Sequence, residues 1–186
     1  MMLSAPHMVH LEAFAERIRA ARPNQETVPS FDPCDGGSEA RVLLLLEAPG
    51  LKAVQSGFVS RNNPDPTARN MLEALQEADL ARVDTALWNI VPWYIGDGGR
   101  IHPAMARDVR AAQQYLAPLL LLLPRLQEVV LVGQKAQRAR PWLAEHSNLR
   151  VSQADHPSNR VYNRWPERRR QVIDVLRQVA CRLTDD

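Results

Sequence analysis

The sequence predicts a single α/β domain in which a four-stranded parallel sheet lies between two layers of helices. Apolar runs of about five residues, typical of strands buried on both faces, are one basis for this prediction. The second is that these runs alternate four times with segments of helical spacing, which indicates right-handed crossovers between parallel strands. A chain of 186 residues, 45% of them hydrophobic, is long enough for one such core and short for two.

Local patterns predict four strands and five helices. The first strand is the aliphatic run 42–46, which starts after Arg41 and ends shortly before the Pro49-Gly50 turn. The other strands are predicted at 84–92, 128–132 and 149–154. The helices are predicted within 1–21, at 66–79, at 103–123, from 133 onward and at 166–183.

The connections between these elements are predicted from turn residues. Residues 1–40 form a helical and then irregular lead-in to one domain that spans 1–186, and residues 51–66 are polar and irregular. Asp65 is a suitable N-cap, with Pro66 at the first helical position. Pro118 either kinks the helix around it or restarts it.

Composition excludes several classes of protein. The two cysteines, Cys34 and Cys181, cannot supply a disulfide framework or a four-cysteine metal site, so we expect no metal and no cofactor. The start of the chain lacks the pattern of a signal peptide. The longest apolar run, 116–123, is far shorter than the ~20 residues that span a bilayer. We therefore expect a cytoplasmic protein with no membrane role.

The net charge of +2 does not by itself indicate a polyanionic partner. Positive charge is concentrated locally, however, because five arginines accompany only one acid, Glu167, over residues 156–170. Such a patch is either a solvated helix face or a surface for a polyanion. The five arginines are Arg160, Arg164, Arg168, Arg169 and Arg170.

Chemically useful residues follow all four predicted strands: Glu47, Asn89, Gly133 and His156. The carboxyl ends of parallel strands gather at one edge of a sheet, where ligands bind. There Glu47 could orient or deprotonate a water, and His156 could donate to an oxygen that gains negative charge. Asn89 offers a donor and an acceptor side by side, which suits the edge of a nucleobase.

Two further features extend this candidate site. The helix opened by residues 133–136 has free N–H groups that favour a phosphate, and Phe58 could stack on a flat ring. Each residue also has an ordinary structural interpretation: Asn89 as a turn cap, Phe58 as a core residue, His156 as a histidine with protein partners. Their coincidence at one edge favours the functional interpretation.

With these residues in place, the sequence resembles the uracil-DNA glycosylase superfamily over about residues 40–175. It is most similar to the branch with a Glu-Ala-Pro-Gly motif, here at 47–50, followed by an aromatic residue, here Phe58. Asn89 matches the middle asparagine, and residues 156–158 match the final His-Pro-Ser motif.

The resemblance implies a three-layer α/β/α fold and hydrolysis of the N-glycosidic bond of a damaged base flipped out of DNA by a monomer. Glu47, Asn89 and His156 would be catalytic. The flipped base would be bound by Ala48, Pro49, Gly50, Phe58 and Asn89. DNA phosphates would be held by Gly133, Gln134, Lys135, Ser158 and Arg160. Val161 or Tyr162 would enter the helix as a wedge.

The sequence departs from the family pattern at three points. Leu46 replaces the glycine before the acid, and Ala48 stands where the most efficient branch carries its water-activating aspartate. Relatives with the Glu-Ala-Pro-Gly motif usually hold an iron–sulfur cluster on four cysteines, whereas this chain has two. Asp65 is an alternative base.

Three functions follow as hypotheses. The first is a DNA repair glycosylase acting on uracil or another deaminated base without a metal. The second, motivated by Leu46 and Ala48, is a lesion-binding protein without turnover. The third, motivated by the modest charge, is a hydrolase of free nucleosides or nucleotides.

Overall fold

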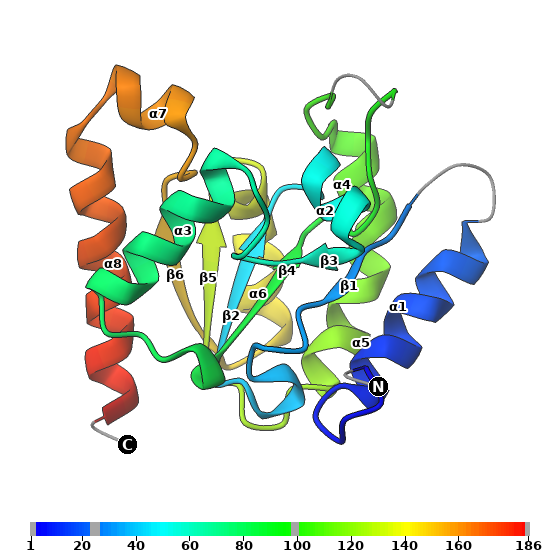
Figure 1. The fold of residues 1–186 in the computed structure, drawn as a ribbon. Coiled ribbons are helices and arrows are strands. Elements are labelled where there is room, and N and C mark those ends of the chain that lie inside the picture. Colours follow the sequence, from blue (N-terminus) through cyan, green and yellow to red (C-terminus); the bar gives the residue numbers. More distant parts are fainter. Residues whose placement is uncertain (1–2, 23–26, 98–100, 185–186) are drawn as a thin grey trace.

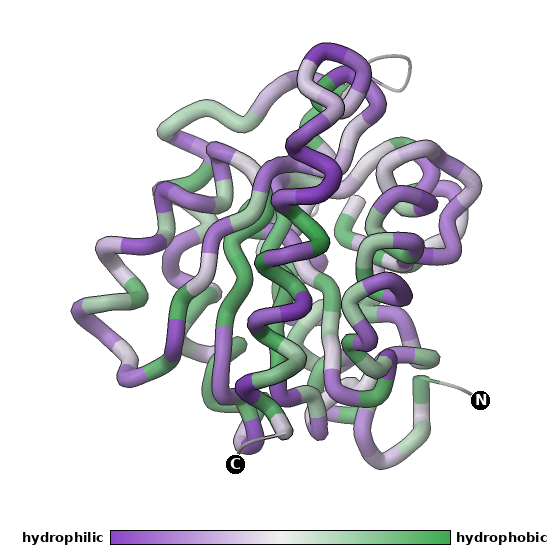
Figure 2. The backbone as a smooth tube through the Cα atoms, turned by 90° about the vertical axis from the view of Figure 1, so that its left-hand side faces the viewer, coloured by the Kyte–Doolittle hydropathy of each residue, from purple (hydrophilic) through white to green (hydrophobic). Residues whose placement is uncertain are grey.

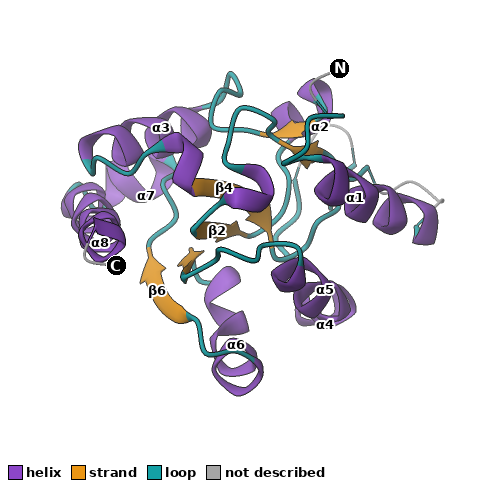
Figure 3. Ribbon diagram, turned by 90° about the horizontal axis from the view of Figure 1, so that it is seen from below, coloured by secondary structure: helices purple, strands orange, loops and turns teal. Residues whose placement is uncertain are grey.

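A computed structural model describes residues 3–22, 27–97 and 101–184. It has three layers, with a parallel sheet between two groups of helices (Figures 1 and 3). Helices α3 (Pro66–Glu77) and α8 (Glu167–Thr184) cover one face, with α7 (Asn159–Arg164) packed against α8. Helices α4 (Ala106–Ala112), α5 (Leu116–Leu121) and α6 (Arg140–His146) cover the other. The predicted α/β fold is therefore confirmed. Residues 1–2 and 23–26 of the predicted lead-in lie outside the described residues.

The main sheet has the order β4-β2-β5-β6, and every neighbouring pair is parallel. Its strands are β2 (Val42–Leu46), β4 (Thr85–Asn89), β5 (Glu128–Val132) and β6 (Arg150–Ala154). All four predicted strands are present. The apolar run of β2 lies in the middle of the sheet, where helices cover both faces, and the side chains of residues 42–45 are fully buried. Figure 2 shows the hydrophobic stretches gathered along these inner strands.

The described helices agree with the prediction in their order along the chain. They are α1 (Val9–Ala21), α2 (Leu51–Ser56), α3 (Pro66–Glu77), α4 (Ala106–Ala112), α5 (Leu116–Leu121), α6 (Arg140–His146), α7 (Asn159–Arg164) and α8 (Glu167–Thr184). The predicted cap of α3 is confirmed, because Oδ1 of Asp65 accepts a hydrogen bond from the Ala68 amide at 3.0 Å. None of these helices combines the length and apolar composition needed to cross a membrane.

Several predicted boundaries were wrong. Pro103 does not open a helix; α4 begins at Ala106, and a 3₁₀ turn separates it from α5. Pro118 lies in the first turn of α5, where a backbone N–H has no intrahelical partner. The N–H that proline lacks therefore costs no hydrogen bond, and the helix restarts rather than kinks. A 3₁₀ turn also precedes α6, and the short helices α2 and α7 were not predicted. Each is only six residues long, too short for a clear apolar period.

The lead-in is packed into the molecule. Strand β1 (Ser30–Phe31) pairs in parallel with β3 (Phe58–Val59) to form a second, two-stranded sheet beside β4. Phe31 stacks on Trp88 of β4, with ring centroids 3.8 Å apart and planes 4° apart. One hydrophobic cluster consequently extends from Met8 of the lead-in to Leu183 near the end of α8.

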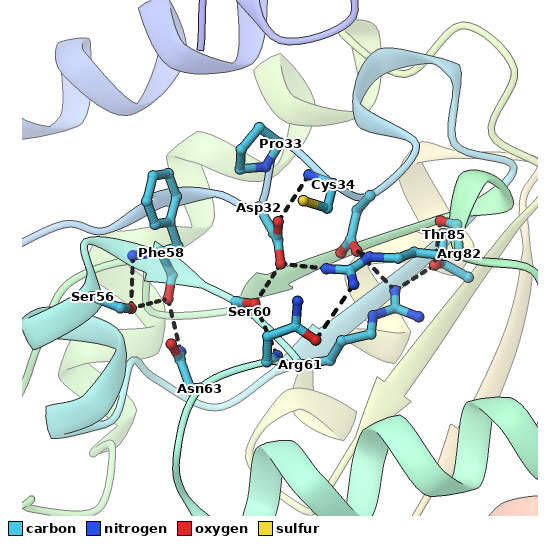
Figure 4. Close-up of polar contacts among 12 residues, drawn as sticks. Asp32, Pro33, Cys34, Ser56, Phe58, Ser60, Arg61, Asn63, Arg82 and Thr85 are labelled. Atoms are coloured by element: carbon cyan, nitrogen blue, oxygen red, sulfur yellow. Dashed lines mark hydrogen bonds and ion pairs between the residues drawn. The ribbon is translucent and has the colours of Figure 1, made fainter. Parts of the chain in front are cut away.

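A cluster of four charged side chains, three of them buried, also ties the lead-in to the loop after β3 (Figure 4). Arg82 donates from Nη2 to Asp32 at 2.6 Å and from Nε to Asp35 at 2.8 Å. Arg61, which is 2% exposed, lies 3.3 Å from Asp35 and donates to the Thr85 hydroxyl at 2.5 Å. We call Asp32, Asp35, Arg61 and Arg82 the charge cluster. Its members lie on three separate segments of the chain, and their contacts join these segments.

Candidate active site

A cavity of about 830 Å³ opens at the carboxyl edge of the main sheet. This is the edge at which the sequence predicts the functional residues. Three of the four predicted strand-end residues, Glu47, Asn89 and His156, line the cavity, whereas Gly133 does not. The parallel topology explains this grouping, because β2 and β4 are neighbours in register with Leu46 opposite Asn89.

Glu47 is held at the cavity by the loop before α4. Its side-chain oxygen Oε1 accepts a hydrogen bond from the backbone amide of Ala104 at 2.6 Å. Its carbonyl accepts a second bond from the Val91 amide at 3.0 Å. The carboxylate is therefore oriented by a backbone donor that belongs to a segment 57 residues further along the chain.

Asn89 lines the cavity and has a buried donor that no described residue uses. Its side chain is 4% exposed, and its Nδ2 atom has no hydrogen-bond partner among the residues that the structure describes. Leaving a buried amide donor unpaired costs about 1–3 kcal/mol. A ligand oxygen in the cavity would remove this cost, so Asn89 is suited to binding a planar ligand with a carbonyl.

His156 packs directly against Gly133. Gly133 has φ +84°, and a Cβ atom at that position would lie 3.1 Å from Cβ of His156. Gly133 thus permits the close approach of the imidazole. Burial lowers the pKa of His156 from its usual value, and the nearby charges of Glu47 and Asp65 offset this only partly. The ring is accordingly neutral near pH 7 and can donate one hydrogen bond without carrying charge.

The loop after Glu47 forms part of the cavity wall. Ala48, Pro49 and Gly50 all line the cavity, as predicted for base-binding residues, and Leu46 lines it too. Asp65, the predicted alternative base, is also in the lining, although one of its oxygens caps α3.

Phe58 is not among the residues that line the cavity. It pairs with Ser30 in β3, and its neighbour Val59 faces the cavity instead, because successive residues of a strand point to opposite sides. In Figure 4 the Phe58 ring points away from Asn63, a cavity-lining residue whose amide donates to the Phe58 carbonyl at 2.9 Å.

The predicted phosphate-binding residues are dispersed. Arg160 is exposed and reaches the cavity, and Ser158 caps α7 by accepting from the Val161 amide at 3.4 Å. The Gly133 amide already donates to the Ala154 carbonyl at 2.8 Å. Gln134 is exposed, and Lys135 donates from Nζ to the Ala104 carbonyl at 2.6 Å. The helix expected directly after Gly133 is a 3₁₀ turn.

The two predicted wedge residues face inward. Tyr162 is 9% exposed and belongs to the hydrophobic cluster, and burial raises the pKa of its hydroxyl to about 12. Val161 packs against the same cluster. The turn of α7 directs these two side chains toward the core and leaves the polar ones outside.

Asn63, Ile101 and His102 are among the cavity residues that sequence reasoning did not identify. Asn63 lies in the segment 51–66, which the sequence predicts only as polar and irregular, and strand β3 before it is too short to be recognised from sequence. Nothing local distinguishes Ile101 or His102. Within the described ranges, no three His, Cys, Asp or Glu side chains come together as a metal site would require.

Comparison with known proteins supports the same conclusion about the fold. A solution NMR structure of a candidate uracil DNA glycosylase from Methanosarcina acetivorans superimposes with a TM-score of 0.52 at 15% identity, covering 77% of this chain and 92% of that chain. No curated protein sequence gives a significant match. The family model described as the uracil DNA glycosylase superfamily matches residues 33–179. This match extends over most of the described chain and contains every residue that lines the cavity, so the chain belongs to the uracil DNA glycosylase superfamily.

Proposed function

We propose that this chain is a DNA repair glycosylase that hydrolyses the N-glycosidic bond of uracil or another deaminated base flipped out of DNA. The observation that carries the proposal is that Asn89, whose buried Nδ2 donor has no partner among the described residues, lines the same cavity as Glu47 and His156. Family membership supports glycosylase chemistry. The motifs at 47–50 and 156–158 assign the chain, within this proposal, to the Glu-Ala-Pro-Gly branch.

Each residue has one step in the proposed mechanism. Extrusion of the base from the duplex costs a few kcal/mol and brings it into the cavity. Asn89 then donates to a carbonyl oxygen on the edge of the base. Neutral His156 donates to an oxygen that gains negative charge as the bond to the sugar breaks. Glu47, oriented by the Ala104 amide, positions the attacking water.

DNA contacts are proposed at the rim of the cavity. Arg160 is exposed and lines the opening, which suits a phosphate next to the flipped nucleotide. Ser158 is the N-cap of α7, two residues before Arg160, and is proposed as a second phosphate contact. Tyr162 is buried and Val161 is half-buried against the hydrophobic cluster, so their positions do not support either residue as a wedge.

The test is abasic-site formation on matched oligonucleotides. Single- and double-stranded substrates carrying one uracil, hypoxanthine or xanthine are incubated with the wild-type protein and with Glu47→Ala. We expect release of at least one of these bases, reduced about 10²- to 10⁴-fold in the variant, as for loss of a general base or water-positioning group. Release of no base from any substrate would refute the proposal.

Lesion binding without turnover is the second candidate, because Leu46 and Ala48 both line the cavity and neither supplies an acid beside Glu47. It predicts selective binding to one damaged oligonucleotide with no abasic product. Turnover of a free nucleoside without salt-dependent DNA binding would instead indicate a small-molecule hydrolase.

A further inference from the structure

We propose that Lys135 is a positioning residue, which orients Glu47 through the backbone of Ala104 and does not bind a DNA phosphate. This inference rests on the proposed function and assigns a new role within the same site. Ala104 is fully buried, and both of its backbone polar groups bond to charged side chains. Its amide donates to Oε1 of Glu47 at 2.6 Å, and its carbonyl accepts from Nζ of Lys135 at 2.6 Å.

The two charged residues come from adjacent strands. Glu47 directly follows β2, and Lys135 lies three residues past the end of β5, which pairs with β2. Ala104 bridges them from a loop, so the loop is bound to two rigid points of the sheet edge. Hydrogen bonds that involve an ionised group are roughly twice as strong as neutral ones. We call Glu47, Ala104 and Lys135 the backbone clamp.

The loop held by the clamp forms one wall of the cavity. Residues 101–103 line the cavity immediately before Ala104. The amide of His102 donates to the Ile95 carbonyl at 2.8 Å, which anchors the other end of this wall. Removing the Lys135 ammonium would leave the buried Ala104 carbonyl unpaired, at a cost of about 1–3 kcal/mol that the loop can relieve by moving. Such a movement would also carry away the amide that orients Glu47.

Geometry opposes the phosphate-binding role that the sequence suggested for Lys135. Its side chain is partly buried, and its amine is directed to a protein carbonyl. Lys135 is also absent from the cavity lining, whereas Arg160 is present. Arg160 at the rim is thus available to contact a phosphate, whereas the Lys135 amine bonds to a protein carbonyl.

Steady-state kinetics on the damaged oligonucleotide separate the two roles. We expect Lys135→Met to lower kcat about 10- to 100-fold with little change in KM, because misplacing a catalytic group by about 1 Å can cost 10²-fold. Lys135→Arg, which keeps a donor, should recover most of kcat. Arg125→Met removes an exposed charge before β5, at the opposite edge of the sheet, and should change neither constant.

Two further comparisons sharpen the test. In a Glu47→Ala background, Lys135→Met should cause little additional loss, because its effect passes through Glu47. For Lys135→Met, the slope of log Kd for the damaged oligonucleotide against log salt concentration should equal that of the wild type. A slope reduced by about 0.9, with raised KM and unchanged kcat, would identify a phosphate contact and overturn the positioning role.

A spectroscopic measurement makes the inference independent of turnover. In ¹H–¹⁵N spectra, the Ala104 amide resonance should shift in Glu47→Gln and in Lys135→Met, and should stay in place in Arg125→Met. If the wild type releases no base but these shifts occur, the clamp stands and the proposed function fails. If the Ala104 resonance does not respond to Lys135→Met, the clamp is refuted even when the wild type is active.

Discussion

Two buried polar regions of this protein differ in how their hydrogen bonds are used. In the charge cluster of Asp32, Asp35, Arg61 and Arg82, every member bonds to another part of the chain. In the cavity, the donor of Asn89 has no partner among the described residues. The first region holds segments of the chain together, whereas the second contains a buried donor that no described residue uses.

The charge cluster itself is not fully satisfied. Oδ2 of Asp35 and Nε of Arg61 are buried without a partner in the described structure. Burial raises the pKa of Asp35 to about 6, although Arg61 and Arg82 both oppose the shift. Burial likewise lowers the pKa of Arg61. The cluster therefore connects the lead-in, β3 and β4 at a cost in desolvation.

Breaking the charge cluster should give the largest effect on stability. Arg61→Met leaves Asp35 as a buried charge with one fewer partner, and we expect the free energy of unfolding to fall by about 3–5 kcal/mol. Urea denaturation followed by circular dichroism measures this. The activity of the variant that remains folded should stay near that of the wild type, because no member of the cluster lines the cavity. A loss under 1 kcal/mol would show that the cluster does not hold the lead-in.

Asn89→Ala should have the opposite profile. Loss of one preorganised donor typically lowers kcat by about 10²- to 10³-fold. Because no described residue partners the wild-type donor, its removal should change the free energy of unfolding by less than about 1 kcal/mol. Base release and urea denaturation of the same preparation give both values. A large loss of stability with little loss of activity would mean that Asn89 is structural.

The smallest effects concern pH, and they should have opposite signs in the two regions. The folded pKa of Asp35 is raised, so this group destabilises the protein above about pH 6, and stability is regained as the pH falls toward 4, by on the order of 2 kcal/mol. The folded pKa of His156 is lowered, so its contribution to stability is present above 6.5 and is lost as the pH falls below that value.

Two variants separate these pH effects. Asp35→Asn should remove the gain in the free energy of unfolding as the pH falls from about 6 toward 4. His156→Gln should remove the decrease in the free energy of unfolding as the pH falls below 6.5. Thermal melts of both variants and the wild type between pH 4 and 8 measure the differences. Parallel curves for all three proteins would contradict both assignments.

Local patterns in the sequence were sufficient for the strands and for the edge at which the site lies. The aliphatic run of β2 specifies a strand buried on both faces, and alternation with helices specifies parallel pairing. Parallel pairing places the strand ends together, so the sequence alone predicts that Glu47, Asn89 and His156 lie at one edge, as the cavity lining confirms. The cap at Asp65 was equally local, since it depends on residues three apart.

Tertiary structure alone decided which way the remaining side chains point and what they bind. The Lys135 amine bonds to a carbonyl 31 residues away, and no periodicity within either segment encodes that pairing. The inward turn of Tyr162 and the position of Phe58 outside the cavity depend on α7 and on the β1–β3 pairing, which are too short to be recognised from sequence. A local pattern determines which face of an element is apolar, whereas contacts between distant segments are set by how the finished elements pack.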